Sequence, residues 1–103
     1  VSVIGKTHQI IFLMKGDIIN NIKEYIFIFD NDIFKVYSHN TKEAESTFIN
    51  MCKQYSKSRS KAHAEYWELL LDKVINQQYQ CIRNEDFKGV GGFYKGVTFC
   101  QES

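Results

Sequence analysis

Three cysteines and three histidines are the side chains of this chain that could carry out nucleophilic or metal chemistry. They are Cys52, Cys81, Cys100, His8, His39 and His63. No Cys-x-x-Cys pair occurs, so a zinc site would have to recruit distant histidines. Cys52 falls on an expected apolar helix face, where burial raises the pKa of a thiol and suppresses its reactivity. The sequence therefore predicts no metal, no cofactor and no catalytic residue; a small Cys/His enzyme is kept as the second alternative.

The number and spacing of the cysteines also bear on the redox environment. Three widely spaced cysteines do not form the even, regular set of a disulfide framework. We therefore expect the cysteines to be reduced and to serve as small apolar side chains. Reduced thiols are typical of a reducing compartment, so we expect a cytoplasmic protein. One disulfide, between Cys81 and Cys100 on neighbouring strands, is left open.

Four carboxylates could form a binding surface. Asp30 and Asp32 flank an expected hairpin tip, and Glu43 and Glu45 begin the helix that follows it. If the hairpin folds toward that helix, the four would make one negative patch that attracts a basic protein partner. The simpler interpretation is that the aspartates form the turn and the glutamates stabilise the helix start.

A basic stretch offers a different chemistry. It contains Lys53, Tyr55, Lys57, Arg59 and Lys61. Cations neutralise phosphates and aromatic rings stack on bases, so the stretch could contact RNA or DNA. Glu65, Glu68 and Asp72 follow closely and offset its charge, which makes nucleic-acid binding the first alternative rather than the leading hypothesis.

The bulk properties narrow the classes of partner. A formal net charge of +1 lacks the basic excess of a dedicated nucleic-acid binder and the acidic excess of a DNA mimic. The longest apolar run, residues 10–14, is far too short to cross a membrane, and residues 1–8 do not resemble a targeting signal. The chain has no proline and is rich in Lys, Asn and Ile, which suggests an AT-rich gene of mobile or phage-like origin.

The elements that would position these groups begin with a hairpin. Aromatic and β-branched residues at 24–29 and 33–37 flank the polar break at residues 30–32. In the first strand Tyr25, Phe27 and Phe29 share one face and isoleucines share the other, which predicts a central strand covered on both faces. The second strand alternates and is expected to be half exposed.

Two helices should follow. Asn40 or Thr41 is a good N-cap, with Glu43 placed as in a capping box. Apolar residues then recur on one helical face up to Tyr55, and a second apolar pattern runs from residue 62 to about residue 77. The serine-rich and basic residues 56–61 join the two helices. Leu69, Leu70 and Leu71 point to different sides of the second helix, so part of it could touch a partner.

Residues 9–14, 80–83 and 93–100 complete the expected strands, and residues 89–92 form a glycine-rich loop. We predict a single α+β domain over residues 1–103, with an antiparallel sheet of four or five strands packed on two helices in the order β-β-β-α-α-β-β. An open sheet edge, for example at the last strand, could pair two copies into a homodimer.

The function expected from these observations is non-catalytic protein binding. A small domain rich in aromatic side chains, without a catalytic or cofactor motif, suits an inhibitor of the immunity or antitoxin type. We expect its partner to be a basic toxin or nuclease, recognised through Asp30, Asp32, Glu43 and Glu45.

Overall fold

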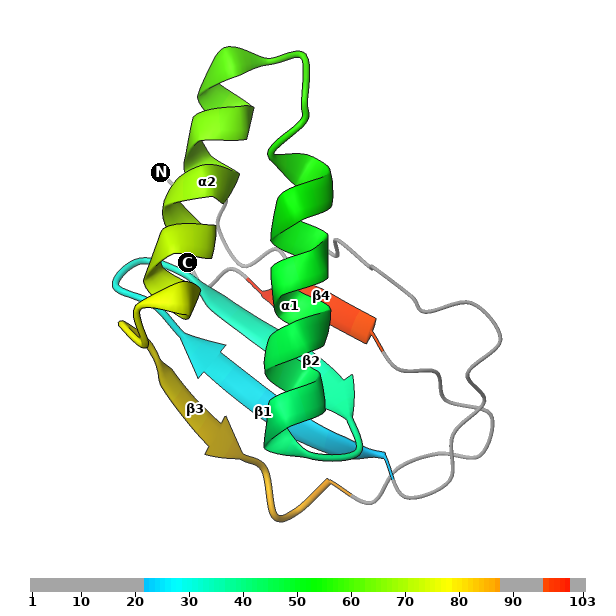
Figure 1. Cartoon of the computed structure of the whole chain (residues 1–103). Helices are drawn as coiled ribbons and strands as arrows, with labels where there is room; N and C mark the ends of the chain where they lie inside the picture. The colour runs from blue at the N-terminus through cyan, green and yellow to red at the C-terminus, as the bar shows by residue number, and fades with distance from the viewer. Residues whose placement is uncertain (1–21, 88–95, 101–103) are drawn as a thin grey trace.

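A computed structural model of the chain describes residues 22–87 and 96–100. Within these ranges a four-stranded antiparallel sheet packs against two helices, which confirms the predicted α+β class (Figure 1). The elements are β1 (Lys23–Ile28), β2 (Ile33–Ser38), α1 (Thr41–Tyr55), α2 (Lys61–Ile75), β3 (Gln80–Arg83) and β4 (Gly96–Cys100). The strand expected at residues 9–14, the loop at residues 89–92 and the start of the strand at 93–100 lie outside the described residues.

The strand order across the sheet is β3-β1-β2-β4. Strand β1 is therefore central, as its sequence predicted, and β3 and β4 form opposite edges (Figure 1). This order corrects one expectation: Cys81 in β3 and Cys100 in β4 are not on neighbouring strands, and both thiols are free. Three inter-strand spacings of about 4.8 Å separate the edges, far more than a disulfide spans.

Both helices cover one face of the sheet (Figure 1). The core between the helices and the sheet is aromatic. Phe27 of β1 and Phe34 of β2 are fully buried and lie directly opposite each other. Phe48 of α1 packs on both rings, at centroid distances of 5.3 Å from Phe27 and 4.9 Å from Phe34. Trp67 of α2 adds a contact of 5.8 Å with Phe34. Each such ring contributes roughly 1.5–3 kcal/mol through burial, which anchors the helices to the hairpin.

Short polar side chains set the helix boundaries. The Asn40 side chain accepts a hydrogen bond of 2.8 Å from the Glu43 backbone N–H, and Ser60 accepts a longer one, 3.4 Å, from the N–H of His63. Helix α2 ends at Ile75, Asn76 is its C-cap, and the next residue, Gln77, has a φ of 59°, in the left-handed region. The N–H of Gln78 then donates to the Lys73 carbonyl at 2.7 Å, which closes a Schellman turn and directs the chain into β3.

Candidate functional site

The tip of the β1–β2 hairpin is the most exposed acidic feature of the predicted site. The Phe29 N–H donates to the Asp32 carbonyl at 2.8 Å, so Asp30 and Asn31 form the turn. Asp30 and Asn31 are exposed and Asp32 is half-buried. The turn thus presents one carboxylate to solvent and a second at the margin of the fold.

Helix α2 holds this tip in place from the side. The Asp30 carboxylate lies 3.5 Å from the ammonium of Lys73, with exposed side-chain fractions of 87% and 25%. An exposed pair of this kind contributes at most about 1 kcal/mol, so Asp30 stays available to an outside cation. Asp32 lies beside Tyr66 of the same helix, and burial together with this neighbouring carboxylate raises the pKa of the Tyr66 phenol well above its ordinary value.

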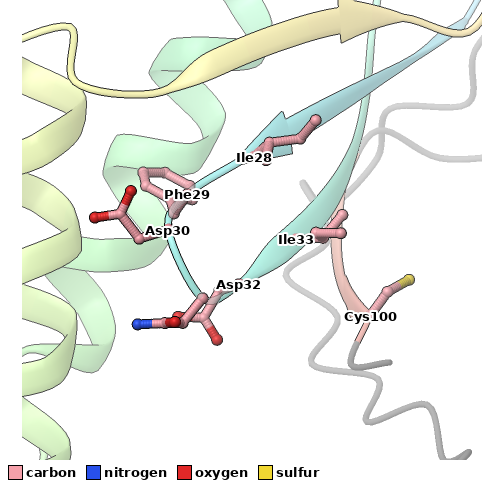
Figure 2. Close-up of a pocket in the computed structure, with 7 residues that line it drawn as sticks. Ile28, Phe29, Asp30, Asp32, Ile33 and Cys100 are labelled. Carbon is pink, nitrogen blue, oxygen red and sulfur yellow. The ribbon is translucent and has the colours of Figure 1, made fainter. Parts of the chain in front are cut away.

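An open depression of about 270 Å³ lies beside the tip (Figure 2). Its apolar wall is a cross-strand row, because Ile28 pairs with Ile33 and Ile33 pairs with Cys100. The turn residues Asp30, Asn31 and Asp32 also line the depression. Figure 2 shows the Asp30 carboxylate directed away from Ile33 and Cys100. The depression therefore adjoins the acidic tip, but the Asp30 carboxylate faces away from its apolar wall.

The two glutamates have different surroundings. A Glu43 carboxylate oxygen accepts from the His39 backbone N–H and contacts the His39 ring Nδ1, each at 2.8 Å. Glu45 accepts from the amide of Gln77 at 2.9 Å and from the hydroxyl of Tyr79 at 2.8 Å. These contacts give Glu43 a role in the helix start and Glu45 a role in tying α1 to the α2–β3 turn.

The structure does not bring Glu43 and the hairpin tip together. The six residues of β2 separate the hairpin tip from the start of α1, a distance of about 20 Å along the strand. Chain reversal after Ser38 places α1 above the sheet with its first turn at the far end of β2 (Figure 1). Glu43 therefore lies far from the tip, whereas Glu45 bonds to Tyr79 at the tip end of the sheet; Asp30 and Asp32 carry the candidate acidic surface.

The basic stretch lies at the junction of α1 and α2, at the end of the helical pair remote from the sheet (Figure 1). Its cations Lys53, Lys57, Arg59 and Lys61 are all exposed. In the part of the chain that the structure describes, none of the four forms an ion pair. The structure therefore brings the four cations to one end of the molecule.

Tyr55 differs from its basic neighbours. Its ring is half-buried and lies 5.2 Å from that of Trp67, between centroids. This contact gives Tyr55 a packing role, so a nucleic acid at this end would be held by charge more than by stacking.

The described groups suited to nucleophilic chemistry differ in burial: His39 and His63 are exposed, and Cys81 and Cys100 are half-buried. Cys52 is fully buried, and burial raises the pKa of its thiol to about 12. Burial and the charge of Glu45 likewise raise the pKa of Cys81. No group of three or more His, Cys, Asp and Glu side chains suited to a metal ion occurs among residues 22–87 and 96–100. His8 lies outside the described residues.

A buried carboxylate that the sequence analysis did not single out lies on the other sheet face. Glu24 is only 5% exposed, and it accepts hydrogen bonds from the hydroxyl of Tyr37 at 2.9 Å and the amide of Asn84 at 2.6 Å. These contacts join β1, β2 and the turn after β3. The hairpin register could have revealed the Glu24–Tyr37 pair, because a turn centred on Asp30-Asn31 places these two residues opposite each other.

Comparison of the chain with family models, curated proteins and solved structures finds no match. In the described ranges, neither helix has the length and apolar character that a membrane span requires.

Proposed function

We propose that this chain is a non-catalytic protein-binding domain that recognises a basic protein partner through its hairpin tip. The observation that carries the proposal is the Asp30 carboxylate, 87% exposed on a tight hairpin that α2 supports. A carboxylate whose backbone is already fixed loses little conformational entropy when it binds a cation. It also attracts a basic partner over distance and so raises the association rate.

The depression beside the tip suits a lysine or arginine of such a partner. The aliphatic stem of either side chain would cover Ile28 and Ile33, and its charged head would lie beside Asp32, which lines the same depression. An arginine adds the option of two parallel hydrogen bonds to one carboxylate.

More narrowly, we propose that the partner is a toxin or nuclease that the chain neutralises. An enzyme that acts on nucleic acid presents cations to bind phosphates. A fixed acidic tip complements such a surface and would block it without any chemistry of its own. The small size and aromatic core of the chain suit a rigid inhibitor of this kind.

The test is capture of the partner from host cells by the tagged chain, followed by mass spectrometry of the protein and nucleic acid recovered. We expect one basic protein in stoichiometric amount, and its loss when Asp30→Asn and Asp32→Asn are combined. Glu68→Gln, an exposed acid on α2, is the matched control and should retain it. Capture of no basic protein, or equal capture by both variants, would count against the proposal.

The four cations at the α1–α2 junction support a second candidate function, binding of RNA or DNA. Neutralising four phosphates of a single strand predicts a slope of log K against log salt of about −3. Replacement of Lys53, Lys57, Arg59 and Lys61 by glutamine should abolish retention on a polyanion resin at low salt. Retention by the native chain that does not depend on these four residues would exclude this candidate.

A further inference from the structure

The hydrogen-bond pattern of the sheet determines which backbone groups of β3 point outward. The Asn84 N–H donates to the Glu24 carbonyl at 2.9 Å, so Asn84 and Glu24 form a hydrogen-bonded pair. Such pairs alternate along an antiparallel ladder. In β3, Ile82 and Gln80 therefore bond to β1, whereas Cys81 and Arg83 direct their N–H and C=O groups away from the sheet.

The β1–β2 ladder gives the same alternation independently. The Phe29 N–H donates to the Asp32 carbonyl, which makes Phe29 and Phe27 residues that bond toward β2. Their neighbours Ile26 and Ile28 must then bond toward β3, as the register requires. Two separate hydrogen bonds thus assign the outward groups of β3.

This outward edge has the features of a strand-pairing surface. Among residues 22–87 and 96–100, nothing pairs with the outward backbone groups of Cys81 and Arg83. Ile82, between them, is 49% exposed and lies beside Ile26 on the sheet face opposite the helices. Strand β3 lies at the outer edge of the sheet (Figure 1) and contains no bulge or proline that would block a further strand.

We propose that β3 pairs antiparallel with β3 of a second copy of the chain, about a two-fold axis at Ile82. In this register Cys81 lies opposite Arg83 of the second copy. The outward N–H and C=O groups of these two residues, four in each copy, then all form hydrogen bonds across the axis. Ile82 meets Ile82 of the second copy in a close, non-hydrogen-bonded pair, and together with Ile26 of each copy it extends the apolar strip across the axis.

Charge and length exclude the neighbouring registers. An axis at Arg83 would place two arginines directly opposite each other, and like charges in that position are destabilising. An axis at Cys81 would place Arg83 opposite Tyr79, which precedes the strand, so that part of the ladder would be lost. Only the axis at Ile82 uses the whole outward edge of β3.

The pairing would join two four-stranded sheets into one continuous sheet. Gln80 lies at the hairpin-tip end of β3, since it pairs with Ile28. An antiparallel arrangement therefore places the two tips at opposite ends of the dimer. Four residues per copy form a small interface, so we expect a dissociation constant on the order of 0.1 mM.

Sedimentation equilibrium from about 10 µM to 1 mM tests the pairing. The native chain should pass from monomer to dimer across this range, and Ile82→Lys, which opposes two like charges, should weaken the dimer at least tenfold. Leu69→Lys is the matched control, because Leu69 is similarly exposed, at 55%, but lies on α2. A native chain that stays monomeric up to 1 mM, or a dimer that Ile82→Lys leaves intact, would overturn the proposal.

A disulfide test fixes the register. In a background of Cys81→Ser and Cys100→Ser, Ile82→Cys should form an intermolecular disulfide on oxidation. Residue 82 is the only position that lies opposite the same position of the second copy. Gln80→Cys in the same background should not, since it lies opposite Asn84 of the second copy. Equal cross-linking at both positions, or none at residue 82, would contradict the two-fold axis.

Discussion

Replacement of Glu24 by alanine should destabilise the domain strongly. The side chain is 5% exposed and accepts hydrogen bonds from Tyr37 at 2.9 Å and Asn84 at 2.6 Å. A hydrogen bond to a charged group contributes about 1.5–3 kcal/mol to stability. Loss of two such hydrogen bonds is partly offset because a buried charge is also removed, so we expect the free energy of unfolding to fall by about 3 kcal/mol. For a domain of this size, that corresponds to a fall in Tm of at least about 12 °C.

Urea unfolding followed by tryptophan fluorescence measures this loss. Trp67 is the single tryptophan and is 1% exposed, so its emission reports loss of the core. Tyr37→Phe removes one donor and should cost about 1 kcal/mol, and the double variant should show coupling of about 1 kcal/mol. Glu68→Ala, an exposed control on α2, should change stability by less than about 0.5 kcal/mol.

A loss of less than about 1 kcal/mol for Glu24→Ala would contradict this expectation. That result would mean that Tyr37 and Asn84 bind water equally well once the carboxylate is gone. The network would then not hold β1, β2 and the turn after β3 together, despite its short contacts.

Three further predictions follow from the helix caps, the buried thiol and the tip. Asn40→Ala should cost about 1 kcal/mol in urea unfolding and Ser60→Ala less, because their capping bonds are 2.8 and 3.4 Å; the reverse order would contradict the assignment. Burial raises the pKa of Cys52 from 9.0 to about 12, so the unfolded state releases a proton above pH 9 that the folded state keeps. The contribution of Cys52 to the free energy of unfolding should therefore be complete below pH 9, and above pH 9 it should fall by up to about 1.4 kcal/mol per pH unit. The Cys52→Ala variant should show a smaller slope, and equal slopes would remove Cys52 as a cause. Asp30→Asn should change the free energy of unfolding by less than about 1 kcal/mol, because its pair with Lys73 is exposed; a larger loss in thermal unfolding would show that the tip is structurally required.

Local patterns predicted much of the fold. The polar break at Asp30-Asn31-Asp32 located the hairpin, and alternation of Phe34 and Val36 correctly assigned the buried face of β2. Asn40, one of the two residues expected as the N-cap, caps α1. These features depend on residues close in sequence, so propensity and periodicity are enough to find them.

Features that depend on long-range order could not be predicted. Cys81 and Cys100 are 19 positions apart in the sequence, yet two strands lie between them, because β1 and β2 occupy the centre of the sheet. The support of Asp30 by Lys73 spans 43 residues and depends on where α2 crosses the hairpin tip. Neither relation has a signature in local sequence, because strand order and helix placement are decided by packing of the whole core.

NMR mapping of the captured partner on the labelled chain tests whether the hairpin tip binds a basic protein. For binding through the tip, we expect backbone shifts to concentrate at Asp30, Asn31 and Asp32 and at Lys73 beside them, and affinity to fall as salt rises. Shifts that instead concentrate at Lys53, Lys57 and Arg59, with the tip unchanged, would contradict it.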